Sequence, residues 1–172
     1  ALLYANGQSV PQDNAEAVRW YRLAAEQGHA RSQAALAAIY LNGRSVEPDA
    51  SEGARWLLLA ADQGYVAAQV DLAYLYGIGR GVPQDDAEAV RLYRLAAEQG
   101  NGYAQYNLGV MYANGVGVPQ DDVLAYMWWN LAAAQGNENA QENKNIAEQQ
   151  MTREQVAEAQ RMSREWLAEH GN

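Results

Sequence analysis

A single pentapeptide returns four times along this chain at constant spacing. It reads Ala-Ala-Glu-Gln-Gly at Ala24–Gly28 and Ala96–Gly100, Ala-Ala-Asp-Gln-Gly at Ala60–Gly64, and Ala-Ala-Ala-Gln-Gly at Ala132–Gly136. The closing glycines are each 36 residues apart, with no insertion. A fixed period of this size is typical of a repeat array, in which each unit buries its apolar face by stacking on its neighbours.

Within each period, the spacing of apolar residues predicts two helices. The first helices carry a stripe at offsets of 3, 4 and 7 residues, beginning with Gln33, Leu36, Ala37 and Tyr40, which places these side chains on one helix face. We expect first helices at Ala30–Asn42, Val66–Ile78 and Gly102–Asn114. We expect second helices at Asn14–Gln27, Ala50–Gln63, Asp86–Gln99 and Asp122–Gln135. The predicted fold is therefore an all-α solenoid of antiparallel helix pairs.

The loop between the two helices contains residues that end one helix and begin the next. A glycine is placed to close each first helix, at Gly7, Gly43, Gly79 and Gly115. An aspartate then serves as the N-cap of the second helix, and a glutamate three residues later gives the spacing of a capping box. These pairs are Asp13 with Glu16, Asp49 with Glu52 and Asp85 with Glu88, whereas Asp121 with Leu124 keeps half of the box. The carboxylates are thus interpreted as caps rather than catalytic groups.

The second helices suggest both a core and a solvent face. Trp20, Trp56 and Trp128 recur at one position of the apolar stripe and are expected to pack in the core or between repeats. Arg22 with Glu26, and equally Arg94 with Glu98, are four residues apart and are expected to form ion pairs on the solvent face.

The two ends of the chain differ from the middle. Ala1–Gly7 matches only the second half of a first helix, so we expect upstream sequence, with any targeting signal, to be missing. At the other end, a polar helix is predicted at Glu138–Gln149, and Thr152 with Gln155 has capping-box spacing. A final helix, Arg153–His170, carries an apolar stripe of Val156, Ala159, Met162 and Trp166. A polar terminal unit is what keeps a solenoid soluble.

Composition narrows the classes of partner. The formal net charge is −9, and Lys144 is the only lysine, which makes nucleic acid and anionic membrane poor partners. No apolar run approaches the roughly 20 residues that a membrane-spanning helix needs, so we expect no membrane insertion. The absence of cysteine is compatible with either the cytosol or the periplasm, and the sequence leaves that choice open.

Candidate catalytic groups are scarce. The histidines are His29, in a turn between repeats, and His170, close to the end of the chain. The sequence contains no recognisable Ser/His/Asp set, metal-ligand cluster or phosphate-binding loop, and Gly79-Arg80-Gly81 lies between predicted helices rather than after a strand. We therefore predict no catalytic, cofactor-binding or metal-binding residues.

These motifs resemble the Sel-1-like repeat, a relative of the tetratricopeptide repeat. The family pattern runs Leu-Gly/Ala-x-x-Tyr, Gly-x-Gly-Val-x-x-Asp, Ala-x-x-Trp-Tyr and Ala-Ala-x-x-Gly. The fullest match comprises Leu108-Gly109, Tyr112, Gly115–Val118, Asp121, Ala125, Trp128-Trp129 and Ala132–Gly136. Tyr76–Asp85, Ala89 and Tyr93–Gly100 match nearly as well, and Met151–Trp166 resembles the terminal helix of bacterial members. Ser9 and Ser45 replace the second loop glycine, which predicts a tighter or strained loop there.

The resemblance implies a single repeat domain over residues 1–172 that forms a right-handed superhelix with a concave face lined by first helices. Its parts would be a partial repeat at 1–28, full repeats at 29–64, 65–100 and 101–136, and a capping unit at 137–172. Such proteins act as scaffolds or adaptors that bind other proteins. The resemblance leaves two alternatives: an inhibitor or immunity protein that blocks a bacterial toxin or enzyme and, more remotely, a protein that binds or hydrolyses β-lactams.

The face of the first helices opposite the packing stripe varies from repeat to repeat, which indicates that packing does not dictate it. It supplies the predicted protein-binding residues, namely Arg31, Ala38, Asn42, Val70, Tyr74, Ile78, Tyr103, Tyr106, Val110 and Asn114. The tyrosines among them either form a binding strip or pack between adjacent first helices. We also expect Leu2, Leu3 and Tyr4, in the incomplete first repeat, to be sheltered by self-association or partly disordered.

Overall fold

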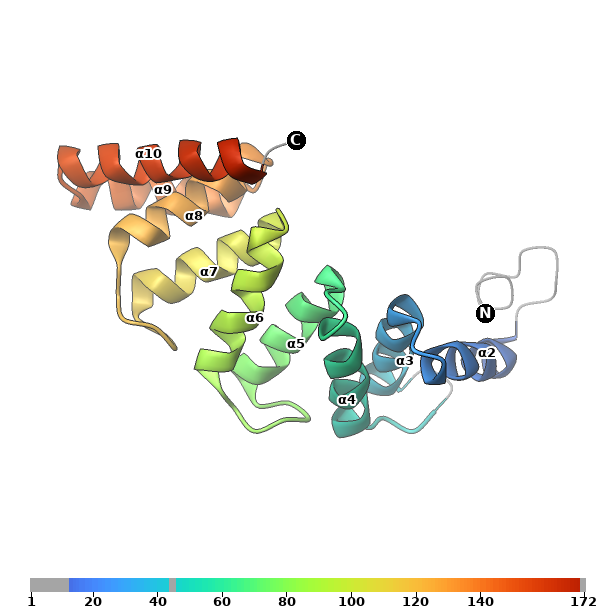
Figure 1. The fold of residues 1–172 in the computed structure, drawn as a ribbon. Coiled ribbons are helices and arrows are strands. Elements are labelled where there is room, and N and C mark those ends of the chain that lie inside the picture. Colours follow the sequence, from blue (N-terminus) through green and yellow to red (C-terminus); the bar gives the residue numbers. More distant parts are fainter. Residues whose placement is uncertain (1–12, 44–45, 171–172) are drawn as a thin grey trace. The chain divides into compact units, whose positions relative to one another are not determined.

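The computed structural model describes residues 13–43 and 46–170, and these ranges are helical apart from turns and short loops (Figure 1). The helices are α2 (Asn14–Glu26), α3 (Ala30–Asn42), α4 (Ala50–Ala61), α5 (Val66–Ile78), α6 (Asp86–Glu98), α7 (Gly102–Asn114), α8 (Asp122–Ala134), α9 (Glu138–Gln150) and α10 (Arg153–His170). The predicted bounds of the first helices α3, α5 and α7 are confirmed. The second helices begin where predicted and end one or two residues earlier.

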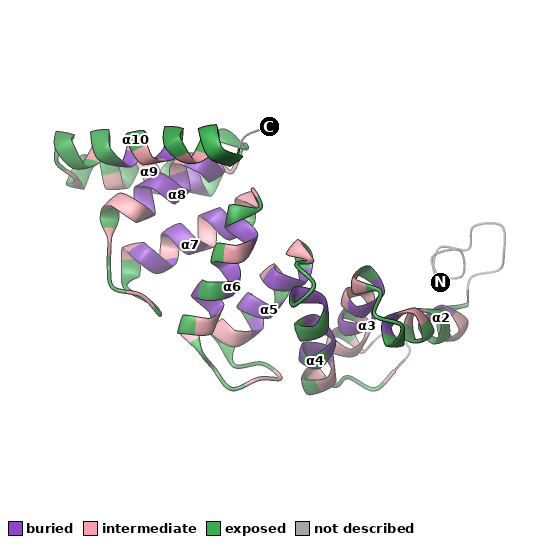
Figure 2. Cartoon of the chain, in the orientation of Figure 1, coloured by how far each residue is buried: buried purple, intermediate pink, exposed green. Residues whose placement is uncertain are grey.

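The chain divides into two compact units, which we call unit 1 (Ala1–Gln84) and unit 2 (Asp85–Asn172). In unit 1, α2 packs on α3, α3 on α4, and α4 on α5. In unit 2, α6 packs on α7, α7 on α8 and α8 on α9, while α10 packs on α8. Figure 2 shows buried and exposed positions along the same helices, as in α4 and α6, whereas most of α8 is buried.

The aspartates cap the second helices as predicted, but the glutamates do not complete the capping box. Asp49 Oδ1 accepts a hydrogen bond from the backbone N–H of Glu52 at 3.0 Å. The Glu52 side chain turns instead to Arg55 and to the indole N–H of Trp56. The backbone N–H of Asp49 donates to the carbonyl of Tyr40, which ties the loop to the first helix.

A reciprocal capping box does form at the start of α10. There the backbone N–H of Thr152 donates to Gln155 Oε1 at 2.8 Å, and the backbone N–H of Gln155 donates to Thr152 Oγ1 at 3.2 Å. The long side chain of Gln155 carries no charge that a neighbouring arginine could attract, so it remains on the cap.

A buried glutamine in each first helix explains the conserved glutamine of the pentapeptide. Gln33, 3% exposed, donates from Nε2 to the carbonyl of Ala25 at 3.1 Å. Its own amide oxygen accepts from Nε2 of Gln63, the pentapeptide glutamine of the same repeat, at 2.7 Å. Gln135 and Gln105 form the same bond in unit 2 at 2.8 Å. Because buried amides must be satisfied, the Gln33 side chain links the preceding repeat, through the carbonyl of Ala25, to the end of its own repeat, through Gln63.

The second loop glycine is required by a close backbone approach. Gly81 has φ of +77°, and a Cβ there would collide with the backbone carbonyl of Ala50. Gly117 has φ of +69° and stands in the same relation to Asp86. The predicted strain at Ser9 and Ser45, like the glycine cap at Gly7, concerns residues outside the described ranges.

Two expectations about the second helices were wrong. Arg22 donates to the hydroxyl of Tyr40 at 2.6 Å, and Arg94 donates to the hydroxyl of Tyr112 at 2.6 Å, instead of pairing with the glutamates four residues later. The arginine side chain is long enough to reach the following helix, where it meets an acceptor that is partly shielded from water. Trp20 is 44% exposed, whereas Trp56 and Trp128 are each 6% exposed and confirm the predicted packing role.

The C-terminal helix α10 covers α8. Ser163 is 1% exposed and donates to the carbonyl of Ala159 at 2.9 Å. The ring of Trp166 meets that of Trp128 edge-on with centroids 6.2 Å apart, and it stacks on His170 at 4.6 Å. These contacts involve the predicted apolar stripe of α10 and cover the last repeat.

Candidate functional site

The predicted binding residues of unit 1 lie on α3 and α5. Arg31, Ala38 and Asn42 on α3 are exposed. Tyr74 and Ile78 on α5 are 50% and 49% exposed. Val70, which precedes Tyr74 by one helical turn, is half-buried. The two sets of side chains therefore come from two helices of the same unit, and most of them are available to solvent.

The predicted residues of unit 2 all lie on α7. Tyr103 is 53% exposed, whereas Tyr106 and Val110 are half-buried. Asn114, at the end of the helix, is exposed, and its amide nitrogen donates to the carbonyl of Val110 at 2.8 Å. Leu2, Leu3 and Tyr4 lie outside the described residues, so the expected self-association stays a prediction that light scattering can test.

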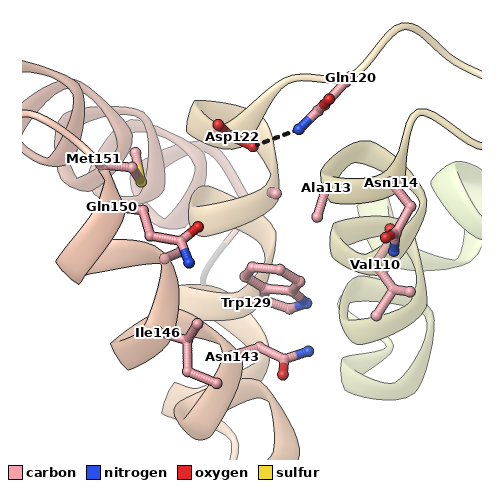
Figure 3. Close-up of a pocket in the computed structure, with 12 residues that line it drawn as sticks. Val110, Ala113, Asn114, Gln120, Asp122, Trp129, Asn143, Ile146, Gln150 and Met151 are labelled. Carbon is pink, nitrogen blue, oxygen red and sulfur yellow. Dashed lines mark hydrogen bonds between the residues drawn. The ribbon is translucent and has the colours of Figure 1, made fainter.

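Unit 2 contains a pocket of about 310 Å³ between α7, α8 and α9 (Figure 3). It is lined by Val110, Ala113, Asn114, Gln120, Asp122, Ala125, Trp129, Asn143, Ile146, Ala147, Gln150 and Met151. Two predicted residues, Val110 and Asn114, belong to it, and Tyr103 and Tyr106 do not. In Figure 3 the labelled residues of α7 face those of α9 across the opening, and Trp129 of α8 stands between them.

The Trp129 ring has a fixed position at the back of the pocket. The residue is 6% exposed, and its indole N–H donates to the carbonyl of Tyr106 at 3.2 Å. The ring edge lies against Gly109, where an added Cβ would be 2.6 Å from Cδ1 and Nε1. Only glycine at this position leaves room for tryptophan. An anchored ring of this kind is a preorganised apolar surface.

Polar side chains surround the opening. Gln120 donates from Nε2 to Asp122 Oδ1 at 3.3 Å, as Figure 3 shows. Asn143 and Gln150 project from α9 on the other side. The lining therefore combines seven apolar residues with five polar ones, and polar groups of this kind fix the orientation of a ligand in a binding site.

Sequence reasoning missed most of this pocket. It named Ala125 and Trp129 as residues that match the family pattern and treated α9 as part of a cap, so that Asn143, Ile146 and Gln150 received no role. One signal was available, because Ala113 occupies the position that Leu41 holds two repeats earlier. A change from a large to a small residue at an otherwise apolar position indicates space in the later repeat.

Helix pairs that repeat with a constant period, together with an open site between successive first helices, define an α-helical solenoid of the kind that binds other macromolecules along its helix faces. The Sel1 repeat model matches residues 1–29, 30–65, 66–101 and 102–137. The chain therefore belongs to the Sel1 repeat family, whose members generally act as non-catalytic scaffolds for protein interactions.

Two solved structures resemble the chain closely. The crystal structure of c5321, a protective antigen of uropathogenic Escherichia coli strains displaying an SLR fold, is 35% identical and superposes with a TM-score of 0.87. The match covers 98% of this chain and 36% of that protein, so the chain spans about a third of its length. A Sel1 repeat protein from Oxalobacter formigenes is 40% identical over 75% of this chain and 97% of its own, with a TM-score of 0.69. No curated protein sequence matches the chain.

Two features are absent from the described residues. None of the helices within residues 13–43 and 46–170 is both long and apolar enough to cross a membrane. The same part of the chain contains no group of three or more His, Asp or Glu side chains arranged to hold a metal ion.

Proposed function

We propose that this chain is a non-enzymatic scaffold that binds another protein through its first helices, and that the pocket of unit 2 anchors the bound segment. The proposal takes residues 1–172 as one repeat domain. The observation that carries it is the pocket itself: a space of about 310 Å³ with a hydrogen-bonded tryptophan at its back and a lining that combines apolar side chains with amide groups. An extended peptide needs such a combination, because side chains require apolar contact and the peptide backbone requires hydrogen-bonding groups.

The exposed tyrosines extend the proposed surface beyond the pocket. Tyr103 stands on α7, the helix that forms one wall, and is 53% exposed. Tyr74 has the corresponding exposure on α5 in unit 1. Tyrosine offers a large contact area with few rotatable bonds, so it contributes to binding at a modest entropic cost. We propose that Arg31, Ala38, Asn42, Val70, Ile78 and Tyr106 contribute to the same kind of surface within their own units.

The test is capture of partners from a bacterial lysate by the wild-type chain and by Ala113→Leu. Leucine at this position fills the pocket in the way that Leu41 fills the corresponding place in unit 1, without adding charge. We expect Ala113→Leu to lose a partner that the wild-type chain retains and to keep the circular dichroism of the wild type, with a loss of stability of about 1–2 kcal/mol, because Ala125 stands where Gly53 faces Leu41 in unit 1.

Two further variants complete the design. Leu167→Ser alters an apolar residue on α10 that is 45% exposed, and it should retain the partner. The triple change Tyr74→Ala, Tyr103→Ala and Tyr106→Ala should weaken capture if the tyrosines contribute. A partner held equally by the wild-type chain, Ala113→Leu and the tyrosine variant would refute binding through these surfaces. The identity of a partner that depends on Ala113 distinguishes an adaptor from an inhibitor of a toxin.

A further inference from the structure

Resting on the proposed function, we propose that the pocket of unit 2 accepts a basic side chain of the bound protein, with arginine as the preferred residue. Its aliphatic stem would lie in the apolar interior, and its guanidinium would reach Asp122 and the amide oxygens at the opening.

The interior suits the stem of a single side chain. Its volume of about 310 Å³ is at the small end of ligand-binding pockets, which span roughly 300–1,000 Å³. Ile146, Met151 and Trp129 supply apolar surface around it. Ile146 is 48% exposed, which is unusual for isoleucine, so a side chain in the pocket would cover surface that now faces water. Arginine covers apolar surface with its methylene groups while its charged head remains at the edge.

The charge at the opening selects the head group. Among the residues that line the pocket, Asp122 is acidic and none is basic. Asp122 follows the N-cap Asp121 at the start of α8, whose Oδ1 already accepts from the backbone N–H of Leu124 at 2.9 Å. The partial positive charge of a helix N-terminus is about half a unit, which two carboxylates exceed. A cation is therefore favoured at this opening and an anion is disfavoured.

The amide groups point to the same conclusion. Asn114 donates from its amide nitrogen to the carbonyl of Val110, and Gln120 donates from its amide nitrogen to the carboxylate of Asp122. Because both acceptors are oxygens, these two amide orientations are determined. The nitrogen of each amide is engaged within the chain, so the carbonyl oxygen is the atom each can offer most readily to a ligand. Acceptors at the opening match the five N–H donors of a guanidinium.

Unit 1 lacks this combination at the corresponding positions. Leu41 replaces Ala113, and Ala50 replaces Asp122, so both the space and the carboxylate are absent there. The middle repeat has a small residue and a carboxylate at these positions, Gly77 and Asp86, but Tyr93 stands in place of Trp129, so the proposal concerns the pocket that Trp129 backs.

The experiment uses capped tripeptides acetyl-Gly-X-Gly-amide, with X as arginine, norleucine or glutamate, titrated into the full chain labelled with ¹⁵N. The indole N–H signal of Trp129, assigned from its loss in Trp129→Phe, reports on the pocket. We expect the arginine peptide to shift this signal and to bind about 1.5-fold to fivefold more tightly than the norleucine peptide, which is the range of an exposed ion pair. The glutamate peptide should bind most weakly.

Two variants isolate the charge and the space. Asp122→Asn should abolish the preference for arginine over norleucine, whereas Glu154→Gln, an identical loss of charge on α10 outside the pocket, should leave it unchanged. Ala113→Leu should remove the response to all three peptides.

Each failure has a distinct meaning. Equal binding of the arginine and norleucine peptides, or no response to arginine at the highest soluble concentration, would overturn this inference. If partner capture still depends on Ala113 in that case, the proposed function stands and only the identity of the anchoring side chain is wrong.

Discussion

The helix pair α3–α4 of unit 1 corresponds to the pair α7–α8 of unit 2, two repeats later. Both pairs pack closely at a glycine, but in unit 1 the glycine is on the second helix and in unit 2 it is on the first. In unit 1 the glycine is Gly53 of α4, where a Cβ would be 2.7 Å from Cγ of Leu41. In unit 2 it is Gly109 of α7, where a Cβ would be 2.6 Å from the ring of Trp129. In both pairs a large side chain of the facing helix packs where the glycine has no side chain.

The exchange of large and small residues decides where space remains. Three residues of unit 1 correspond to residues of different size in unit 2, namely Leu41 to Ala113, Gly53 to Ala125 and Leu57 to Trp129. In unit 1 the leucine of α3 lies over the glycine of α4 and fills the site. In unit 2 two alanines leave the site open beside the tryptophan. The comparison shows that two repeats can share the same helices and differ in which positions carry large side chains. This difference in side-chain size creates the pocket of unit 2.

The largest expected loss of stability comes from a substitution at Gly109. Gly109→Ala should destabilise the chain by about 3 kcal/mol, because the Trp129 ring is held by its own hydrogen bond and the new Cβ would also lie 3.1 Å from the backbone carbonyl oxygen of Ala125. Urea denaturation gives the free energy of unfolding.

Gly77→Ala is the matched control for Gly109→Ala, since Gly77 lies within α5 and an added Cβ meets nothing within 4 Å. There alanine should stabilise the chain by about 0.5–1 kcal/mol, through helix propensity alone. A Gly109→Ala chain as stable as the wild type would show that the close approach in unit 2 is not rigid.

The arrangement in unit 1 is tested by a double-mutant cycle. Gly53→Ala alone should cost about 1–2 kcal/mol, because the new methyl group meets the branch point of Leu41. In the Leu41→Ala background the same change should be neutral or stabilising, since helix propensity favours alanine over glycine. The two changes together would reproduce the arrangement of unit 2. Additive effects in urea denaturation would mean that Leu41 and Gly53 are not coupled.

The arginine–tyrosine hydrogen bonds, one in each unit, allow a second comparison between the units. Arg94→Met should cost about 1 kcal/mol, because the hydroxyl of Tyr112 loses its donor in a residue that is 8% exposed. Arg22→Met should cost less, since Tyr40 is half-buried and water can replace the arginine. Equal losses in thermal or urea unfolding would show that burial of the tyrosine does not affect the strength of this bond.

The smallest expected effect is on the stability of the chain at low pH. The hydrogen bond from Arg55 lowers the pKa of the Glu52 carboxyl below its ordinary value of 4.5, and the bond from Trp56 acts in the same direction. A carboxyl whose pKa is lowered by folding contributes stability that is present above the unfolded pKa and lost as pH falls through the folded pKa. Glu52→Gln should therefore reduce the loss of stability below about pH 4.5. Identical acid unfolding of the variant and the wild type would exclude a contribution from Glu52.

Much of the architecture follows from the sequence because its determinants are local. The bounds of α3, α5 and α7 were predicted correctly, since glycine ends each helix and the apolar stripe fixes its face. The hydrogen-bond partners of long polar side chains were not predictable in the same way. Arg22 and Arg94 had a partner within their own helix at the correct spacing, but they bond to tyrosines of the next helix, and the energies of exposed alternatives differ too little for sequence to choose.

The sequence by itself determined that this protein is a stack of helix pairs with a 36-residue period, because periodicity, caps and glycines act within one repeat. Only the tertiary structure decided which repeat has an open site, because that depends on how the volumes of Ala113, Ala125 and Trp129 add across two facing helices. Packing is a property of side chains from separate segments, so no local pattern contains it.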